Sequence, residues 1–592
     1  MATPVTLVKG IIKEFLKESN IQDSVNVPVQ MTRDEFEGEV TIASFPLAKI
    51  FKKSPPEVAS AIKEFIESKY GDKIKKIEVK GGFVNISFSD SFWLEFIKTL
   101  VDSDEYPIFP QKSETVVIEF SSPNTNKPQH LGHVRNNVLG WATAMLLQRT
   151  GTKKVIKVNL INDRGIHISK SMLAWLKWGN GVTPEKAGKK GDHLIGDFYV
   201  MFEKEYKKQV EELMNKGMTK EEAMEKAPLM QEARELLRRW EAGDPEVLKI
   251  WRMLNDWVLK GFDETYKRLG IEFDHIDYES ETYKLGKEIV QEGLEKGIFY
   301  QKEDGSVWVD LTDVGLDHKL LLRSDGTSVY ITQDLGTIEL RWNRYKMDLM
   351  IYVVAEEQEY HFKVLQAILK KLGRPYADRI YHLSYAMVDL PTGKMKSREG
   401  TVIDADDLLD ELHLLAYEKI NESPKTASLS EEEKHDLAEK IALGAIKFYM
   451  LRVDPKKRIL FRKEEALDFE GYTGPFIQYT HARIVSLWEK AQDKPSSIDF
   501  HYDFNKSERQ LLKLMAFYGE ILQEATRKYD PSALTNFLYR LAKEFNRYYA
   551  NTPIVKETND FARSARLLLS KSIQKILMDG STVLGIPLPE RM

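Results

Sequence analysis

The sequence predicts an α/β protein built on a parallel sheet, with a helical insertion, an N-terminal α+β domain and an all-α C-terminal domain. Three observations indicate this fold. At 592 residues the chain is long enough for several domains. Short apolar runs alternate with helical patterns in residues 113–180 and again in 326–430, as they do in parallel sheets. From residue 431 to 592 the pattern is helical almost throughout.

Composition excludes several classes of protein. Hydrophobic residues make up 42% of the chain and charged residues 30%, as in ordinary globular proteins. No run of about 18 apolar residues exists and the N-terminus lacks an apolar signal core, so we expect no membrane span and no secretion signal. The absence of cysteine excludes disulfides, thiolate zinc sites and cysteine nucleophiles. With a net charge of -5, any RNA surface must be a local basic face.

Residues 1–112 form a separate α+β module in this interpretation. Helices are expected at 5–18 and 55–70, the second with proline in its first turn. Strands are expected at 39–45 and 76–88, the latter interrupted by two glycines that mark a turn or bulge. Composition alone assigns this module no function.

The chain is organised around residues 119–133, where a strand turns into a helix. Thr115–Phe120 is a β-branched and apolar run of strand length. From Val134 apolar residues recur at helical spacing until Gly151 closes the helix. Unpaired backbone N–H groups and the positive end of the helix dipole make such a junction a natural place for phosphates.

Two histidines stand in the first turn of this helix. His130 and His133 lie three residues apart, and Gly132 removes a side chain where a flat base or a ribose could lie. By itself such a pair is more often a half-filled metal site or two surface histidines. Because neither cysteine nor carboxylates occur nearby at zinc spacing, we expect no bound metal and interpret the histidines as transition-state donors.

The sheet pattern is interrupted once. A second strand at 154–160 and its helix are followed by residues 181–325, which hold long charged helices and a hairpin-like segment at 298–311. We interpret 181–325 as an insertion between the two halves of the sheet, and its charge runs as solvated helix faces. Residues 326–430 supply the second half.

A basic loop follows the last predicted strand of the second half, at 381–388. It contains Lys394, Met395, Lys396, Ser397 and Arg398. Cations in a loop of this kind can clamp a triphosphate and stabilise charge on leaving pyrophosphate. Alone the loop is a weak signal, but its place after a strand and far beyond the first motif strengthens it.

Together the two motifs resemble the signatures of class I aminoacyl-tRNA synthetases and related nucleotidyl transferases. The string from Ser121 to Arg135 resembles arginyl-tRNA synthetases specifically. The resemblance implies a Rossmann-type catalytic core, ATP as substrate with Mg²⁺ on its phosphates and no tightly bound protein metal. It further implies L-arginine and tRNA(Arg) as partners, arginyl-adenylate as the intermediate and the terminal ribose of tRNA as the acceptor.

The resemblance also implies roles for motif residues. ATP would be bound by His130, Gly132, His133, Lys394 and Met395. The implied catalytic residues are His130, His133, Lys127, Lys394, Lys396 and Arg398. Lys396 and Ser397 depart from the family's serine and lysine, so the cation that acts on the phosphates is left open. Lys127, just before the first motif, holds the position thought to substitute for the missing lysine.

Selection of arginine requires carboxylates or amide oxygens placed for a planar guanidinium. Tyr330 and Asp334 are four residues apart and face the same way in a strand or a helix. They match the family's arginine-binding tyrosine and aspartate, and Gln358 matches its glutamine. Without the flanking motifs, Asp334 would be a helix cap and Tyr330 a half-buried sheet aromatic. The residues matching those at the α-amino end are Glu119, Ser122, Asn124 and His133.

The C-terminal helices, 431–592, carry a basic stripe. Between Asp530 and Tyr549 an apolar face opposes Arg540, Lys543 and Arg547. A solvated stripe is the simpler interpretation of one helix. However, the region adds basic residues and tyrosines that suit unstacked RNA bases: Lys456, Lys457, Arg458, Arg462, Arg563, Arg566, Tyr539, Tyr548 and Tyr549. The family resemblance adds Tyr472, Gln478 and Arg483 as tRNA-binding residues.

We therefore expect an arginine–tRNA ligase that works in the cytoplasm as a monomer, with residues 431–592 on the anticodon side of tRNA. The segment Gly81–Asn85 resembles one in the family's N-terminal module, which implies that residues 1–112 contact the tRNA elbow. One rival is another class I ligase or a small-molecule adenylyltransferase, against which the basic helical domain argues. The other is a catalytically silent tRNA-binding paralogue, which has no need to retain His130, His133, Lys394 and Asp334.

Overall fold

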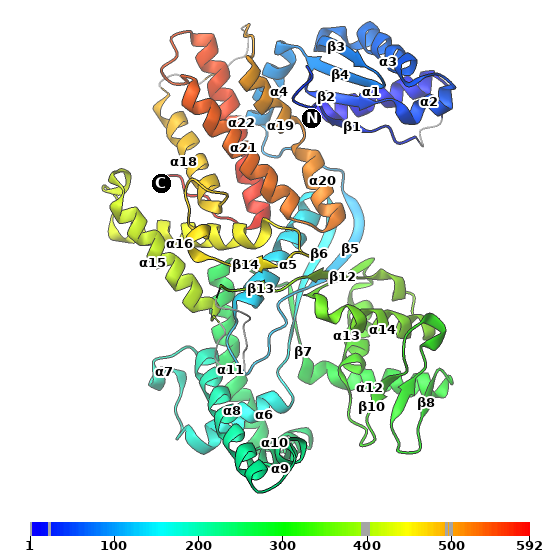
Figure 1. Ribbon diagram of the computed structural model, residues 1–592, viewed down its shortest axis with the longest axis vertical. Coiled ribbons are helices and arrows are strands. Elements are labelled where there is room, and N and C mark those ends of the chain that lie inside the picture. Colours follow the sequence, from blue (N-terminus) through cyan, green and yellow to red (C-terminus); the bar gives the residue numbers. More distant parts are fainter. Residues whose placement is uncertain (1–2, 22–24, 392–402, 492–494, 496–500) are drawn as a thin grey trace. The chain divides into compact units, whose positions relative to one another are not determined.

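A computed structural model describes residues 3–21, 25–391, 403–491, 495 and 501–592 (Figure 1). The chain divides into two compact units, each described by itself. One unit comprises Met1–Pro110, Ala416–Arg452 and Glu464–Met592, and the other comprises Gln111–Leu415 and Val453–Lys463. We call them the helical unit and the catalytic unit.

A five-stranded sheet forms the centre of the catalytic unit. Its strands are β5 (Lys112–Glu119), β6 (Thr152–Ile161), β7 (His275–Tyr278), β11 (Leu349–Ala355) and β12 (Ile380–Tyr385). Their order is β12-β11-β5-β6-β7 and all four pairings are parallel. The connections from β5 and β11 run in opposite directions, so the carboxyl ends of these two strands define the topological switch point where α/β sheets bind ligands.

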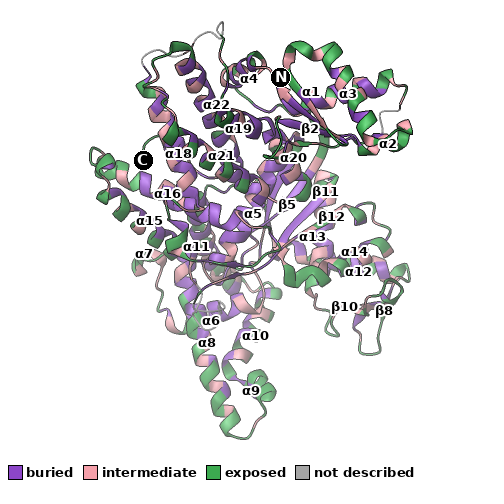
Figure 2. Ribbon diagram, turned by 45° about the horizontal axis from the view of Figure 1, so that its top comes forward, coloured by how far each residue is buried: buried purple, intermediate pink, exposed green. Residues whose placement is uncertain are grey.

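Helices surround this sheet because its strands are apolar on both faces. Val117, Ile156 and Val158 of the sheet share a buried core with Ile331, from α13 (Tyr330–Tyr345), and Leu365, from α14 (Glu359–Lys371). The helices of the unit are α5 (Leu131–Arg149), α6 (Ile166–Trp178), α7 (Pro184–Ala187), α8 (Gly191–Asn215), α9 (Lys220–Lys226), α10 (Pro228–Glu241), α11 (Pro245–Leu269), α12 (Glu279–Glu295), α13 (Tyr330–Tyr345) and α14 (Glu359–Lys371). In Figure 2 the strand β11 is mostly buried, whereas much of α9 is exposed. The parallel-sheet prediction is confirmed.

The predicted insertion, 181–325, needs one correction. Its residues 275–278 form β7, the edge strand beside β6, and therefore belong to the sheet. The alternation of His275-Ile276-Asp277-Tyr278 is too short to separate from the surrounding helical patterns in sequence. The hairpin prediction is confirmed: β8 (Phe299–Gln301), β9 (Val307–Val309) and β10 (Lys319–Leu322) make a small antiparallel sheet.

Residues 453–463 also need reassignment. We predicted them as part of the helical domain, but they lie in the catalytic unit. Here β14 (Ile459–Leu460) pairs in parallel with β13 (Val388–Asp389), and Arg135 of α5 donates to the carbonyls of Pro455 and Lys457 at 2.9 and 2.8 Å. Lys456, Lys457, Arg458 and Arg462 thus do not belong to the same unit as Arg540, Lys543 and Arg547, contrary to our prediction.

The helical unit contains the N-terminal module. Its antiparallel sheet has the order β1-β2-β4-β3, with a hairpin at the predicted pair of glycines. The strands and helices of the module are β1 (Val29–Met31), β2 (Val40–Ala43), β3 (Ile74–Lys80), β4 (Phe83–Phe88), α1 (Pro4–Glu18), α2 (Phe45–Phe51), α3 (Pro55–Tyr70) and α4 (Asp90–Asp102). The helices expected at 5–18 and 55–70 are confirmed.

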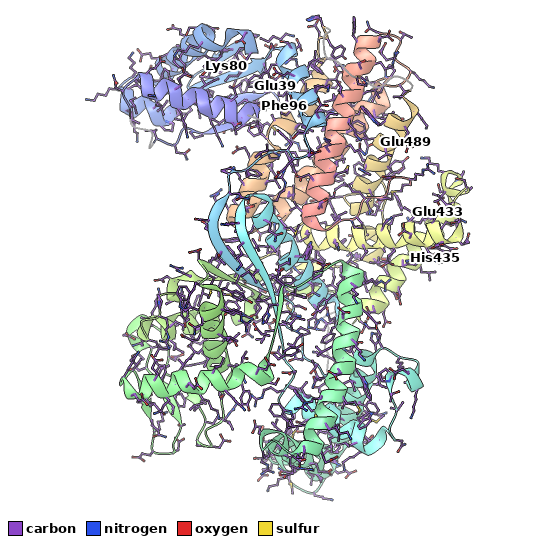
Figure 3. All side chains as sticks on the ribbon, turned by 180° about the vertical axis from the view of Figure 1, so that it is seen from behind. Glu39, Lys80, Phe96, Glu433, His435 and Glu489 are labelled. Carbon is purple, nitrogen blue, oxygen red and sulfur yellow. The ribbon has the colours of Figure 1, made fainter. Side chains whose placement is uncertain are left out.

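The C-terminal part of the chain is helical, as predicted. Its helices are α15 (Ala405–Glu422), whose first residues belong to the catalytic unit, α16 (Glu431–Leu451), α17 (Lys463–Ala466), α18 (Gly474–Lys490), α19 (Lys506–Ala516), α20 (Tyr518–Lys528), α21 (Ser532–Asn551) and α22 (Asp560–Leu584). Arg509 of α19 joins them to the N-terminal module through ion pairs with Glu39 (labelled in Figure 3) and Asp90, at 2.8 and 2.5 Å. Both carboxylates are buried, and burial raises the pKa of Glu39.

Candidate active site

The carboxyl end of β5 is held in an unusual backbone conformation. Ser121 and Ser122 follow the strand with φ of 75° and 47°, a region that side-chain-bearing residues rarely occupy. The amide oxygens of Asn136 and Asn159 accept their backbone N–H groups at 2.6 and 3.0 Å. Strain of this kind persists where surrounding bonds fix it and is concentrated at functional sites. The neighbouring helix can approach because Gly140 has no side chain; a Cβ there would lie 2.4 Å from that of Phe120.

The two predicted histidines form the N-terminal cap of α5. The Nδ1 of His133 accepts the backbone N–H of His130, and the Nδ1 of His130 accepts that of Gly132, each at 3.1 Å. The arrangement is a capping box with imidazoles in place of the usual hydroxyl and carboxylate. It also gives a reason for Gly132 within the protein itself: a Cβ there would lie 2.9 Å from the His130 ring, so the glycine makes room for that imidazole.

Burial keeps both rings neutral, and the capping hydrogen bonds determine the tautomer. Burial, reinforced by the charge of Lys127, lowers the pKa of His130 to about 3, and burial lowers that of His133 well below its usual range. Both imidazoles are therefore neutral at pH 7. Since Nδ1 accepts a hydrogen bond in each, the proton is on Nε2. The site thus presents two neutral N–H donors without a cationic imidazole.

A cavity of about 450 Å³ adjoins this cap. Its lining includes Lys127, Gln129, His130, Lys190 and Asp404. The backbone after the basic loop pairs with the first motif here: Leu131 donates to the carbonyl of Ile403 at 3.2 Å, and Ala405 to that of Gln129 at 2.9 Å. The loop residues Lys394, Met395, Lys396 and Arg398 lie outside the described residues.

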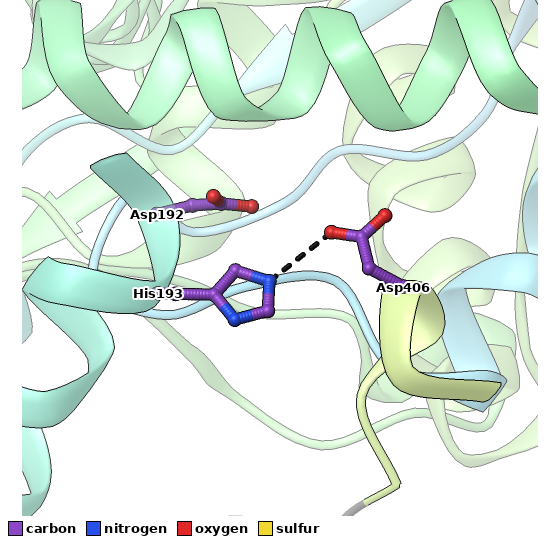
Figure 4. A group of neighbouring side chains, drawn as sticks. All are labelled: Asp192, His193 and Asp406. Atoms are coloured by element: carbon purple, nitrogen blue, oxygen red, sulfur yellow. Dashed lines mark hydrogen bonds and ion pairs between the residues drawn. The ribbon is translucent and has the colours of Figure 1, made fainter. Parts of the chain in front are cut away.

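A polar cluster stands at the rim of this cavity (Figure 4). Asp406 accepts from His193 at 3.1 Å, while Asp192 is fully buried beside them. Their ligand atoms lie within 4.8 Å of one another, a spacing that could hold a metal ion. The ammonium of Lys190, 2.5 Å from Asp406 and 3.4 Å from Asp192, already supplies positive charge there. The cluster therefore gives no reason to assign a metal.

The predicted arginine residues lie on α13 and beside α14. Tyr330 is the first residue of α13 and is 74% exposed. Asp334, one turn later, lies 2.5 Å from the Nε2 of His361. Gln358 is exposed just after β11, three residues before His361. Neither simpler alternative holds, because Tyr330 is not in a sheet and Asp334 lies beyond the helix cap.

Glu119, predicted to hold the α-amino end, has a partner that the sequence did not reveal. Its carboxylate pairs with Arg341 of α13, which is fully buried, and accepts from the Ser122 hydroxyl at 3.2 Å. Arg341 also lies 3.0 Å from Asp277 on β7. Asn124 follows β5 as an exposed residue whose backbone forms a bridge with that of Asn162.

A further carboxylate belongs to this region. Glu279 begins α12 at the carboxyl end of β7, and burial raises its pKa to about 7. Asp334 is close enough to add to that shift electrostatically. Sequence reasoning missed Glu279 because it lies inside the predicted insertion with no motif around it. The signal available was its place directly after a short alternating run, and His361 could have been noted beside Gln358.

The candidate tRNA residues of the helical unit differ in exposure. Arg540, Lys543 and Arg547 are exposed on α21, opposite a buried apolar face, as predicted. The guanidinium of Arg483 lies 4.8 Å from the ring of Tyr479 and 4.9 Å from that of Tyr549.

Other members of that set are internal. Gln478 is fully buried and donates to the carbonyls of Lys440 and Pro587, each at 2.7 Å, so its side chain is not available to RNA. Tyr472 bonds to Asn536. Tyr548 is buried against Glu508, at 3.0 Å, and Arg566 pairs with the same carboxylate. The expectation of exposed aromatics therefore holds for Tyr549 and not for Tyr548.

Comparison with known proteins agrees with this geometry. Residues 96–460 match the family described as tRNA synthetases class I (R), catalytic domain. Residues 477–592 match the DALR anticodon binding domain, and residues 6–88 match the arginyl tRNA synthetase N terminal domain. The parallel sheet with its switch point and the histidine cap thus define a class I tRNA synthetase catalytic unit.

Full-length relatives narrow the class. The arginine–tRNA ligase of Bacteroides thetaiotaomicron is 50% identical, covering 100% of this chain and 99% of the relative. That of Porphyromonas gingivalis is 48% identical, with 96% of each covered. The solved structure of Thermus thermophilus arginyl-tRNA synthetase aligns with a TM-score of 0.79 at 25% identity, covering both chains completely. The chain belongs to the arginyl-tRNA synthetase family, whose activity is the ATP-dependent ligation of arginine to tRNA.

Proposed function

We propose that the chain activates L-arginine at the carboxyl ends of β5 and β11 and transfers it to the 3′-terminal ribose of tRNA(Arg). The observation that carries this proposal is the histidine cap. Two neutral Nε2–H donors at a helix N-terminus suit the charge that develops when the arginine carboxylate attacks the α-phosphate. We assign this stabilisation to His130 and His133, assisted by the cation of Lys127.

Recognition of arginine is assigned to two groups at either end of the amino acid. Asp334 and Glu279 supply carboxylates for the guanidinium, with Tyr330 and Gln358 at the edge of that pocket. Glu119, Ser122 and Asn124 receive the α-amino end. The substrate is cationic, so a pocket that selects it needs fixed negative charge, and lysine cannot copy the planar fork.

We assign the phosphate-clamping role to the basic loop, with Lys394, Lys396 and Arg398 as candidates and Met395 as a contact to the nucleotide. MgATP is the expected form of the substrate. For tRNA, we assign the anticodon side to Arg483, Arg540, Lys543 and Arg547, and the elbow to the N-terminal module. We further propose that the protein works as a monomer in the cytoplasm, where tRNA is charged for translation. Within the described residues, no helix is both long and apolar enough to cross a membrane.

One assay tests the proposal directly. ATP–pyrophosphate exchange is measured with each of the twenty amino acids, with and without tRNA. Of the twenty amino acids, only arginine should support exchange. His130→Ala should abolish most of this exchange while the protein stays folded. Exchange that is faster with another amino acid would sink the arginine assignment. An unchanged exchange rate in His130→Ala would show that His130 has no part in arginine activation.

A further inference from the structure

One residue connects the two ends of the proposed arginine site. Arg341 lies on α13, the helix that begins with Tyr330 and carries Asp334. Positions 330, 334 and 341 lie on one stripe of the helix, because seven residues are close to two turns. Asp334 and Arg341 are thus about 10 Å apart along a single rigid element.

Arg341 is buried completely among charged partners. Its Nη1 pairs with Glu119 at the end of β5, and its Nε lies 3.0 Å from Asp277 on β7. The exposed side-chain fractions of Arg341, Glu119 and Asp277 are 0%, 8% and 2%. Burial alone would lower the pKa of Arg341, but the two carboxylates raise it above its ordinary value, so the guanidinium stays charged.

The carboxylates of the proposed site differ in whether an arginine of the protein pairs with them. Glu119 is neutralised by Arg341, and Asp277 is shared between Arg341 and Arg344, the latter 3.1 Å away. Asp334 has only a histidine beside it among the contacts described above. Among the ion pairs of the described residues, Asp334 is thus paired with no arginine or lysine, whereas Glu119 offers a fixed hydrogen-bond acceptor whose charge is balanced by Arg341.

We propose that Arg341 is a positioning residue for amino-acid recognition. It aims the Glu119 carboxylate at the α-amino group and cancels its charge, so that the substrate guanidinium is drawn to Asp334 and not to Glu119. Because one helix carries Asp334 and Arg341, the spacing of the two ends is set by α13. This inference rests on the proposed role of Glu119.

The test uses substrate analogues that lack one end of arginine. 5-Guanidinopentanoate lacks the α-amino group, and L-citrulline lacks the side-chain charge; each is measured as a competitive inhibitor of aminoacylation. The variant is Arg341→Lys, which keeps the charge but loses the fork. Arg344→Lys is the matched control, since Arg344 is on the same helix and contacts Asp277 but has no contact with Glu119 among those described.

Arg341→Lys should reduce the preference for arginine over 5-guanidinopentanoate by roughly tenfold, the scale of one charged hydrogen bond. Its preference for arginine over citrulline should stay within about twofold, and Arg344→Lys should change neither. Loss of both preferences together would mean that the fold has loosened, and loss of neither would mean that Glu119 needs no support. Either result overturns the inference.

Two further variants protect the test. If thermal unfolding shows that Arg341→Lys does not fold, Asp277→Asn is used instead, because it removes the other carboxylate that holds Arg341. Its preferences for arginine over 5-guanidinopentanoate and over citrulline are measured in the same way. Glu119→Gln separates the inference from its foundation. If that variant keeps the full preference for the α-amino group, the proposed role of Glu119 is wrong. If it loses that preference while Arg341→Lys keeps it, only the role of Arg341 fails.

Discussion

The first turn of α5 and the outer face of α21 both carry residues that we assign to substrates, yet they are built in opposite ways. His130 and His133 are half-buried, and in each the Nδ1 accepts a hydrogen bond from the protein's own backbone. Arg540, Lys543 and Arg547 are exposed on a helix whose other face makes the core. Stabilising a transition state needs donors fixed beforehand, whereas attracting a polyanion needs charge that reaches solvent.

Replacing His133 is the strongest test of the buried region. On the proposed role, His133→Ala removes a donor to the reacting phosphate, so the rate of arginine activation should fall roughly a hundredfold. It also removes a helix cap, worth about 1 kcal/mol of stability. His133→Glu separates the two effects, because glutamate at this position can accept the His130 N–H but cannot donate. In His133→Glu the rate of pyrophosphate exchange should stay low while the thermal stability returns to that of the wild type. If the exchange rate also returns, His133 acts only as a helix cap.

The second test concerns the charged end of the amino-acid site. Asp334→Asn keeps the size of the side chain but removes the charge, which costs about 3 kcal/mol where a substrate cation loses its partner. Arginine use should then fall roughly a hundredfold, with the KM for ATP almost unchanged. Asp313→Asn, which alters a more exposed pair with Lys371, is the control. Equal arginine kinetics in Asp334→Asn and wild type would contradict the assignment.

Arginine binding should also depend on pH through Glu279. Burial raises the pKa of this carboxyl to about 7, so below that pH the free site holds a proton. A bound guanidinium favours the carboxylate, and binding must then release the proton. The affinity for arginine should fall as the pH drops below 7, approaching about tenfold per pH unit. The measurement is KM for arginine between about pH 6 and 8; Glu279→Gln should flatten that part of the profile, and an unchanged slope in the variant would exclude Glu279.

The smallest effect is expected on the exposed face. Arg540→Ala, Lys543→Ala and Arg547→Ala together should weaken tRNA binding by roughly threefold to tenfold at moderate salt. The dependence of log K on log salt should become shallower by about two to three, since each phosphate contact contributes about 0.7–0.9. Binding is titrated at several salt concentrations. The same three substitutions should leave thermal stability nearly unchanged, and an unaltered salt slope would make the stripe a solvated face.

The comparison also explains what could be predicted from sequence. The strand before His130 and the helix after it have strong periodicity, and the parallel sheet followed from repeating that pattern. Asp334 could be placed because its spacing from Tyr330 is local. Arg341 could not, since no motif surrounds it and its partner Glu119 lies 222 residues away in the chain. In the helical unit the sequence did not show which polar side chains are buried. Gln478 and Tyr548 were expected to face RNA, but their polar groups form hydrogen bonds inside the protein.

The joining of the N-terminal module to α19 has a consequence for synthesis on the ribosome. Glu39 and Asp90 emerge early, whereas their partner Arg509 follows 470 and 419 residues later. At about 5–20 residues per second, translation leaves these carboxylates without that partner for roughly 20–90 s. During this interval the surface of the nascent module that contacts α19 in the folded protein is exposed to water and to chaperones. Its native docking is therefore among the last steps of folding, although its sequence comes first.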